Sequence, residues 1–88
     1  MSKKHSKPEY LYVVFDGRAT PDNTDEACVL EAFGAPTAAI AFKESKETWG
    51  KMGAQLFRYR TTQDNKLVEQ TYIGPVDMSW RDFRNMHG

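Results

Sequence analysis

The sequence is poor in the residues on which disulfide frameworks, histidine chemistry and membrane spans depend. Its 88 residues include one cysteine, Cys28, and two histidines, so an internal disulfide is excluded. No apolar run approaches the roughly 20 residues that span a bilayer, and no signal-peptide core follows the basic start. We therefore expect a cytoplasmic protein without a membrane partner, in which Cys28 stays reduced.

The chain also lacks a net charge, because twelve basic side chains balance twelve acidic ones. Whole-molecule charge therefore gives no reason to expect nucleic acid as a partner. The two signs are unevenly placed along the chain. Residues 9–33 contain six acidic residues and only Arg18 as a base, whereas residues 50–61 contain three basic residues and no acidic one. This asymmetry predicts charged patches on the surface.

A single domain over residues 9–88 is predicted, after a flexible basic tail over residues 1–8. Aromatic and β-branched residues in "EYLYVVFD", residues 9–16, are typical of a strand. "CVLEAF", residues 28–33, alternates similarly and predicts a second strand that pairs antiparallel with the first. A helix that begins at Thr24 is the alternative for this segment, since Thr-Asp-Glu is a favourable helix start.

The second half of the chain predicts a helix, a hairpin and a short final helix. Residues 34–53 are rich in alanine and favour a long helix. Residues 54–61 and 67–74 predict two strands joined by the turn "TQDNK", and Asp77 or Ser79 can cap a C-terminal helix. The predicted fold class is α+β: an antiparallel four-stranded sheet in ββαββ order, with the long helix on one face.

Both faces of the predicted sheet are apolar, which leaves one of them without a cover. We expect the long helix to cover Leu11, Val13, Phe15, Cys28, Leu30, Ala32, Phe57 and Tyr59. The reverse face would then carry Tyr10, Tyr12, Val14, Val29, Phe33, Leu56 and Tyr72. A solvated sheet face is normally polar, so an apolar face of this size indicates an interface.

Three covers for the reverse face are considered. The C-terminal helix can fold back and place Trp80 and Phe83 on the tyrosines, or a second copy of the chain can form a homodimer. Bases of a nucleic acid can also stack there beside Arg58 and Arg60, although the zero net charge disfavours this partner. The predicted interface residues are Tyr10, Tyr12, Phe33, Leu56, Arg58, Arg60 and Trp80.

Small, charged and turn-forming residues are concentrated between the first two strands, in "FDGRATPDNTDEA". A calcium loop alternates oxygen ligands around a glycine, but here Gly17 comes too early and Pro21 stiffens the middle, so no metal is expected. Asp16 is expected to form an ion pair with Arg18. The segment is predicted to orient a basic partner through Asp16, Arg18, Asp22, Asp25 and Glu26.

Catalytic residues are hard to find in this sequence. Cys28 lies in an apolar alternation, where inert buried thiols are usual. His5 and His87 lie near the two ends of the chain, where neither is expected to be held as a general base. We therefore predict that the protein is not an enzyme and uses no cofactor.

The segment "YVVFDGRA", followed by "TDEACVLEAF" and the alanine-rich helix, resembles small, uncharacterised accessory proteins of bacteriophages. The similar features are a strand ending in D-G-R-A, a T-D-x-A segment, a strand like "VLEAF", a helix and a hairpin. The resemblance covers about residues 10–60 and leaves out the tail and the C-terminal "DMSWRDFRNMHG". It implies a protein that acts in the cytoplasm of an infected host, commonly as an inhibitor of a host or defence protein.

The expected function is that of a non-enzymatic binding protein, a homodimer that inhibits a host protein by occupying its surface. The first alternative is a binder of nucleotides or signal molecules, with Arg18, Arg58 or Arg60 on a phosphate. The second alternative is a single-stranded nucleic-acid binder that uses the aromatic face of the sheet.

Overall fold

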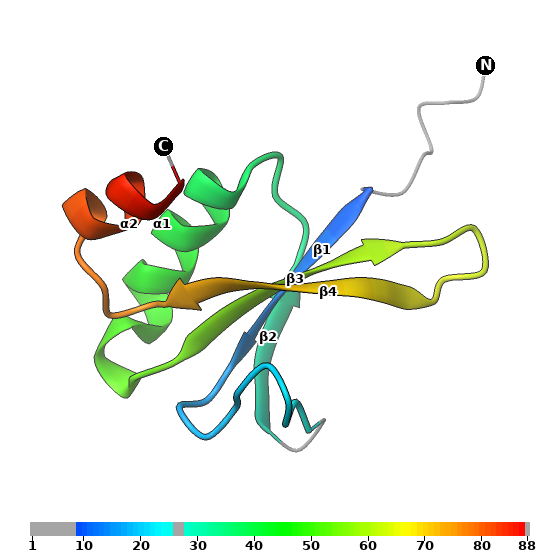
Figure 1. The fold of residues 1–88 in the computed structure, drawn as a ribbon, viewed down its shortest axis with the longest axis horizontal. Helices are drawn as coiled ribbons and strands as arrows, with labels where there is room; N and C mark the ends of the chain where they lie inside the picture. The colour runs from blue at the N-terminus through cyan, green and yellow to red at the C-terminus, as the bar shows by residue number, and fades with distance from the viewer. Residues whose placement is uncertain (1–8, 26–27, 88) are drawn as a thin grey trace.

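Two helices and a four-stranded antiparallel sheet make up the computed structural model, which describes residues 9–25 and 28–87 (Figure 1). The elements along the chain are β1 (Tyr10–Phe15), β2 (Val29–Phe33), α1 (Ala38–Trp49), the 3-10 turn η3 (Gly50–Met52), β3 (Gln55–Thr61), β4 (Leu67–Pro75) and α2 (Trp80–His87). The strands lie side by side in the order β2-β1-β3-β4. The predicted α+β class and ββαββ arrangement are confirmed, and the predicted tail lies outside the described residues.

The helix α1 begins and ends where the local chemistry predicts. The hydroxyl of Thr37 accepts a hydrogen bond from the amide of Ile40 at 3.2 Å and caps the first turn. After Trp49 the chain tightens into η3, and Gly53 ends this turn with a φ of 67°. Glycine adopts this left-handed conformation without the strain that a Cβ would bring.

Both helices lie side by side on one face of the sheet, at one end of the long β3–β4 hairpin (Figure 1). The rings of Phe42 from α1 and Phe83 from α2 stack with their centroids 4.2 Å apart, and both side chains are buried. Ser79 holds the start of α2, because its hydroxyl accepts from the amide of Asp82 at 3.1 Å. The main core therefore combines both helices with one face of the sheet.

The helices cover the face of the sheet that bears the tyrosines. Tyr12, Val14 and Leu56 lie in this core, with at most 2% of each residue exposed. The prediction that α1 covers the face of Val13 and Phe15 is therefore wrong. Alternation along a strand shows which side chains share a face, but it cannot choose between two apolar faces. Of the three predicted covers, the structure contains the C-terminal helix folded onto the tyrosine face.

A β-bulge in the β1–β2 pairing breaks the alternation expected for "CVLEAF". Val14 pairs with Glu31 whereas Phe15 pairs with Val29, so Leu30 is the additional residue. Leu30 packs against the main core, and Glu31 accepts a hydrogen bond from the indole nitrogen at the end of α1 at 2.8 Å. Leu30 and Glu31 thus both contact the helix layer, whereas neighbours in a regular strand point to opposite faces. Val29 stays with Phe15 on the opposite face.

Two serine-to-alanine substitutions are expected to change the stability in opposite directions. Ser45 is 1% exposed and its hydroxyl has no hydrogen-bond partner among the described residues, so Ser45→Ala should raise the free energy of unfolding by about 0.5–2 kcal/mol. Ser79→Ala removes the cap of α2 and should lower it by about 0.5–2 kcal/mol. Urea denaturation measures both shifts. A loss of stability in Ser45→Ala would contradict the packing described for α1.

Candidate binding surface

The β1–β2 loop folds across the face of the sheet opposite the helices. Ala19 is 4% exposed and packs with Val13, Phe15 and Phe57 in a second apolar cluster. A turn at the start of the loop is closed by the amide of Ala19, which donates to the carbonyl of Asp16 at 3.1 Å. The loop thus covers part of the face that carries Val13 and Phe15, which α1 had been predicted to cover.

Gly17 lies where the loop passes close to the backbone of Gly53. A Cβ at Gly17 would lie 2.8 Å from the carbonyl oxygen of Gly53, closer than real Cβ contacts come. Only glycine therefore lets the loop pass this close to the turn between η3 and β3. This close approach gives the glycine of "DGRA" a role in backbone packing.

Gln70 of β4 holds the far end of the loop against the sheet. Its amide nitrogen donates to the carbonyl of Pro21 at 2.8 Å, and its amide oxygen accepts from the hydroxyl of Tyr59 at 2.8 Å. The hydroxyl of Thr24 donates to the same oxygen at 3.2 Å. One exposed side chain therefore joins the loop to β3 and β4.

The loop covers only part of the Val13 and Phe15 face, and an apolar groove of about 270 Å³ remains beside it. We call it the loop groove; it is lined by Leu11, Val13, Phe15, Thr24, Val29, Ala32, Tyr59 and Leu67. Val29 and Leu67 are 39% and 45% exposed. Tyr72 is also exposed, and its ring lies 5.0 Å from that of Phe57 on the same face. Exposed apolar side chains gathered in one place are typical of a contact surface.

Sequence reasoning missed the loop groove because it placed most of its lining residues beneath α1. Val13, Phe15 and Tyr59 were assigned to the covered face, and Val29 to the other one. The bulge at Leu30 brings Val29 onto the face of Phe15, and no local pattern in the sequence marks this bulge. The groove becomes visible only once the covered face and the pairing register are known.

Acidic residues of the loop adjoin groove-lining residues in the chain, and we call these acidic residues the acidic rim. Asp16 and Arg18 form the predicted ion pair, with 2.8 Å between the Arg18 Nη2 and Asp16 Oδ2 atoms. Hydrogen bonds from the side chain and the backbone of Arg18 lower the pKa of Asp16. Asp22 and Asp25 are exposed and lie within two positions of Thr24, which lines the groove. Glu26, the fifth predicted partner-binding residue, lies outside the described residues.

The predicted interface residues on the tyrosine face belong to the inside of the molecule. Tyr12 and Leu56 are fully covered core residues, so the prediction that they contact a partner is wrong. Tyr10 and Phe33 are half-buried and pack against the same core. Tyr12 and Leu56 are covered because the helices lie over this face of the sheet.

The two arginines of β3 are engaged within the chain. Arg58 lies over the ring of Tyr10, with 4.3 Å between the guanidinium carbon and the ring centroid. Arg60 forms an ion pair with Glu69 at 2.7 Å, and the hydrogen bond from Arg60 lowers the pKa of Glu69. Trp80, the last predicted interface residue, lies on α2 and is 43% exposed. The residues predicted as one interface therefore do not form one surface.

The described residues contain no group of three histidine, cysteine, aspartate or glutamate side chains that could hold a metal ion. Cys28 is half-buried beside the second apolar cluster, and its backbone carbonyl accepts from the amide of Asp16 at 2.8 Å. No helix within residues 9–25 and 28–87 is long and apolar enough to cross a bilayer. The loop groove itself offers apolar contact area and a rim of carboxylates.

Comparison with protein-family models, curated proteins and solved structures found no match to this chain. Inferences about its function therefore start from the loop groove and its charged rim.

Replacing Gln70 is expected to release the loop without unfolding the sheet. Gln70→Glu loses the amide donor to Pro21 but keeps an acceptor for Tyr59 and Thr24, whereas Gln70→Ala loses all three hydrogen bonds. Hydrogen exchange should become faster in both variants at the amides of Thr20 and Asn23, which bond to each other's carbonyls. The free energy of unfolding should fall by less than about 1.5 kcal/mol in Gln70→Glu. Unchanged exchange would show that Gln70 does not hold the loop.

Arg18→Gln is expected to raise the pKa of Asp16 toward its usual value, because Arg18 is the main cause of the depression. The folded-state pKa of Asp16 lies below the unfolded one. Any stabilisation from this pair is therefore present above the unfolded pKa and is lost as the pH falls through the folded pKa. NMR titration of the Asp16 carboxyl carbon in both proteins measures the shift, and identical titration curves would contradict the pairing.

Proposed function

We propose that the protein is a non-enzymatic binding protein, and that the loop groove receives apolar side chains from a partner protein. The observation that supports this most directly is the loop groove itself, an open apolar patch on a sheet face that is normally polar when solvated. The resemblance of about residues 10–60 to phage accessory proteins supports a host protein as the partner, met in the host cytoplasm. By occupying the partner's surface, the chain would act as an inhibitor.

The size of the loop groove favours a protein partner over a small molecule. Its volume of about 270 Å³ is below the roughly 300–1,000 Å³ of pockets that enclose small ligands. Thr24 and Tyr59 supply its hydroxyl groups, and the hydroxyls of both residues already bond to Gln70. The groove therefore has room for the apolar side chains of a docked segment but few polar groups to orient a small polar molecule.

The acidic rim suggests the charge of the partner. Residues 16–25 of the loop contain Asp16, Asp22 and Asp25, and the one base among them, Arg18, is paired with Asp16. A partner with basic residues beside its docked apolar side chains would be attracted and oriented by this rim. Such exposed charges act mainly on the rate of association, and salt weakens their effect.

Val29→Lys is expected to weaken partner binding by about tenfold or more, because it places an ammonium group in an apolar contact. Ile40→Lys is the matched control, since Ile40 on α1 is 40% exposed and Val29 is 39% exposed. A photo-crosslinking residue at Leu67 identifies the partner in host lysate. Calorimetry with that purified protein then gives the Kd of each variant. Equal Kd values for wild type and Val29→Lys would refute the proposal.

A second copy of the chain is the rival occupant of the loop groove, and sedimentation of the purified chain separates the two. We expect a monomer whose sedimentation is the same in Val29→Lys. A dimer that Val29→Lys dissociates would instead assign the groove to the homodimer predicted from the sequence.

A further inference from the structure

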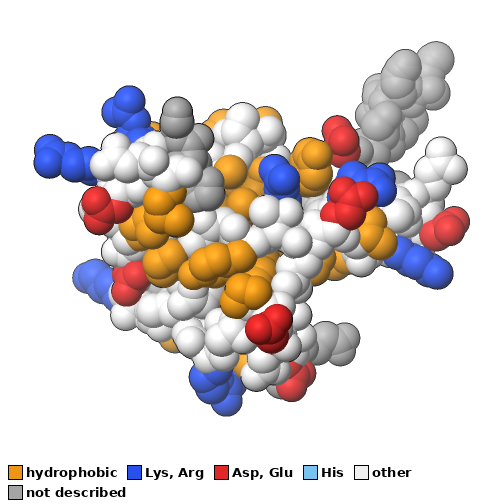
Figure 2. Space-filling model, viewed as in Figure 1, with side chains coloured by type: hydrophobic (Ala, Val, Ile, Leu, Met, Phe, Trp, Pro, Cys, Tyr) orange, Lys and Arg blue, Asp and Glu red, His pale blue; other side chains and the backbone are white. Residues whose placement is uncertain are grey.

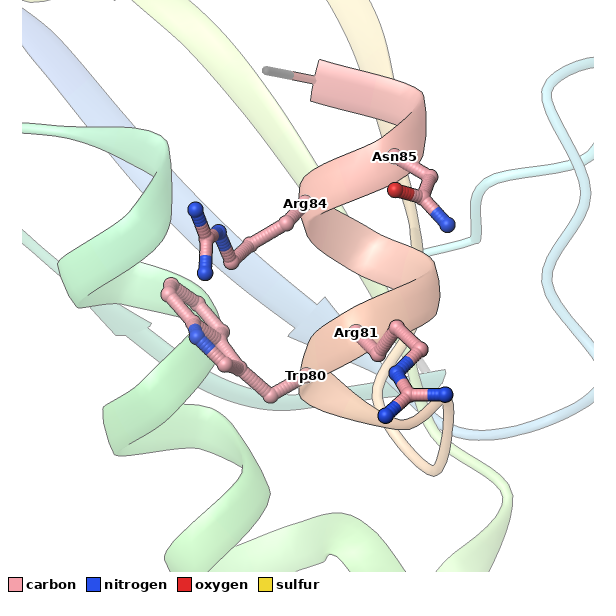
Figure 3. Close-up of a pocket in the computed structure, with 4 residues that line it drawn as sticks. All are labelled: Trp80, Arg81, Arg84 and Asn85. Carbon is pink, nitrogen blue, oxygen red and sulfur yellow. The ribbon is translucent and has the colours of Figure 1, made fainter.

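A second surface, on the helix layer, brings basic and aromatic side chains together. Basic side chains project from the end of the molecule where the helices lie (Figure 2). Trp80, Arg81, Arg84 and Asn85 of α2 line an open hollow of about 720 Å³, which we call the α2 hollow. Figure 3 shows Trp80 and Arg84 extending toward α1, and Arg81 and Asn85 extending from the opposite side of α2, away from α1.

The indole of Trp80 is held in place and yet open to solvent. Its ring stacks on Phe83 with 5.7 Å between centroids and an interplanar angle of 18°, and it lies 6.1 Å from the ring of Phe42. Phe42 and Phe83 are buried, whereas Trp80 is 43% exposed. Contacts with two core rings thus orient the indole, and its open part is a preformed flat surface.

Four basic side chains surround this indole. Arg81 and Arg84 line the α2 hollow, and Lys43 and Lys46 of α1 line an adjoining hollow of about 310 Å³ that shares the indole. Lys46 donates to a backbone carbonyl at 2.8 Å. Within the described part of the chain, the side chains of Lys43, Arg81 and Arg84 form no ion pair. The first turn of α2 contains one acidic residue, Asp82, and the described residues that line the two hollows include no acidic one.

We propose that the α2 hollow binds a nucleotide unit, with its base on the Trp80 indole and its phosphate on Arg84, the arginine that extends to the same side of α2. Arg81 adds positive charge on the other side of α2. Stacking on an aromatic ring accepts every base, because each base has a flat π-face. Guanidinium groups pair with phosphate oxygens through parallel hydrogen bonds. The zero net charge of the chain does not oppose this local concentration of cations.

The open shape of the α2 hollow suits a nucleotide within a single strand. A strand that crosses the indole passes from Arg84 of α2 to Lys43 and Lys46 of α1, and so meets more than one cation. A free nucleotide carries the same base and phosphate chemistry but cannot reach both hollows at once. The site lies on the layer opposite the loop groove, so it is independent of the partner proposed there.

In a variant whose one tryptophan is Trp80, fluorescence can measure the contact between a base and the Trp80 indole. The chain has two tryptophans, and Trp49→Phe leaves Trp80 as the one fluorophore while keeping an aromatic ring at the end of α1. We expect a short oligothymidylate to quench the Trp80 emission at low salt, because stacking brings a base onto the indole. Absence of quenching by the strand and by ATP would overturn the proposal.

Two charge-matched variants in this background test the arginines. Arg84→Gln should weaken strand binding severalfold and reduce the slope of log K against log salt by about 0.7, the value for one lost phosphate contact on a single strand. Arg60→Gln removes the same charge from the β3–β4 hairpin and should leave the slope unchanged. Equal effects of the two variants would show non-specific attraction and would refute the α2 hollow as the site.

Competition between different ligands separates base stacking on Trp80 from phosphate binding by Arg84. Inorganic tripolyphosphate lacks a base, so it should compete with the strand more weakly than ATP does; equal competition would overturn the stacking of a base on Trp80. Tighter binding of the strand than of ATP would assign the α2 hollow to single-stranded nucleic acid. Equal affinity for both would assign it to free nucleotides, with the same residues in the same roles. Val29→Lys should change neither affinity.

Discussion

A sheet whose two faces are both apolar has to be covered twice, and this requirement organises the whole molecule. The two helices cover one face and bury Tyr12 and Leu56 there. A domain of this size has no second long helix for the other face, and the β1–β2 loop takes that place through Ala19. A loop covers less area than a helix layer does. The loop groove is the part of the sheet that remains after the chain has used its own segments.

Local patterns in the sequence were sufficient to predict the elements, their order and their caps. Ser79, one of the two predicted caps, holds the start of α2, and the hairpin follows from its turn residues. The face that the helices cover was not predictable, because the face with Tyr12 and the face with Val13 are about equally apolar. Which face is covered depends on how α1 packs against the sheet as a whole, and the pattern within one strand does not contain this information.

The candidate surfaces were predictable only in part, and the reason is their dependence on distant contacts. The acidic loop stands out by composition, and the pairing of Asp16 with Arg18 follows from their spacing. Gln70, however, meets Pro21 across 49 positions, and periodicity within a strand carries no information about such a contact. The aromatic and basic side chains of α2 could be predicted to lie together, since Trp80 and Arg84 are four residues apart on a helix. Trp80 was predicted instead to cover the sheet, and the arginines beside it were not assigned a role.

The β1–β2 loop is held by one exposed side chain, Gln70, and this affects how the surface around the loop groove can change in evolution. Gln70 contributes nothing to the buried clusters, so selection can exchange it without jeopardising the fold. A single codon change in β4 can then uncover more of the sheet or close it, and in this way alter which molecules are recognised. The architecture would persist across a lineage while its specificity drifts.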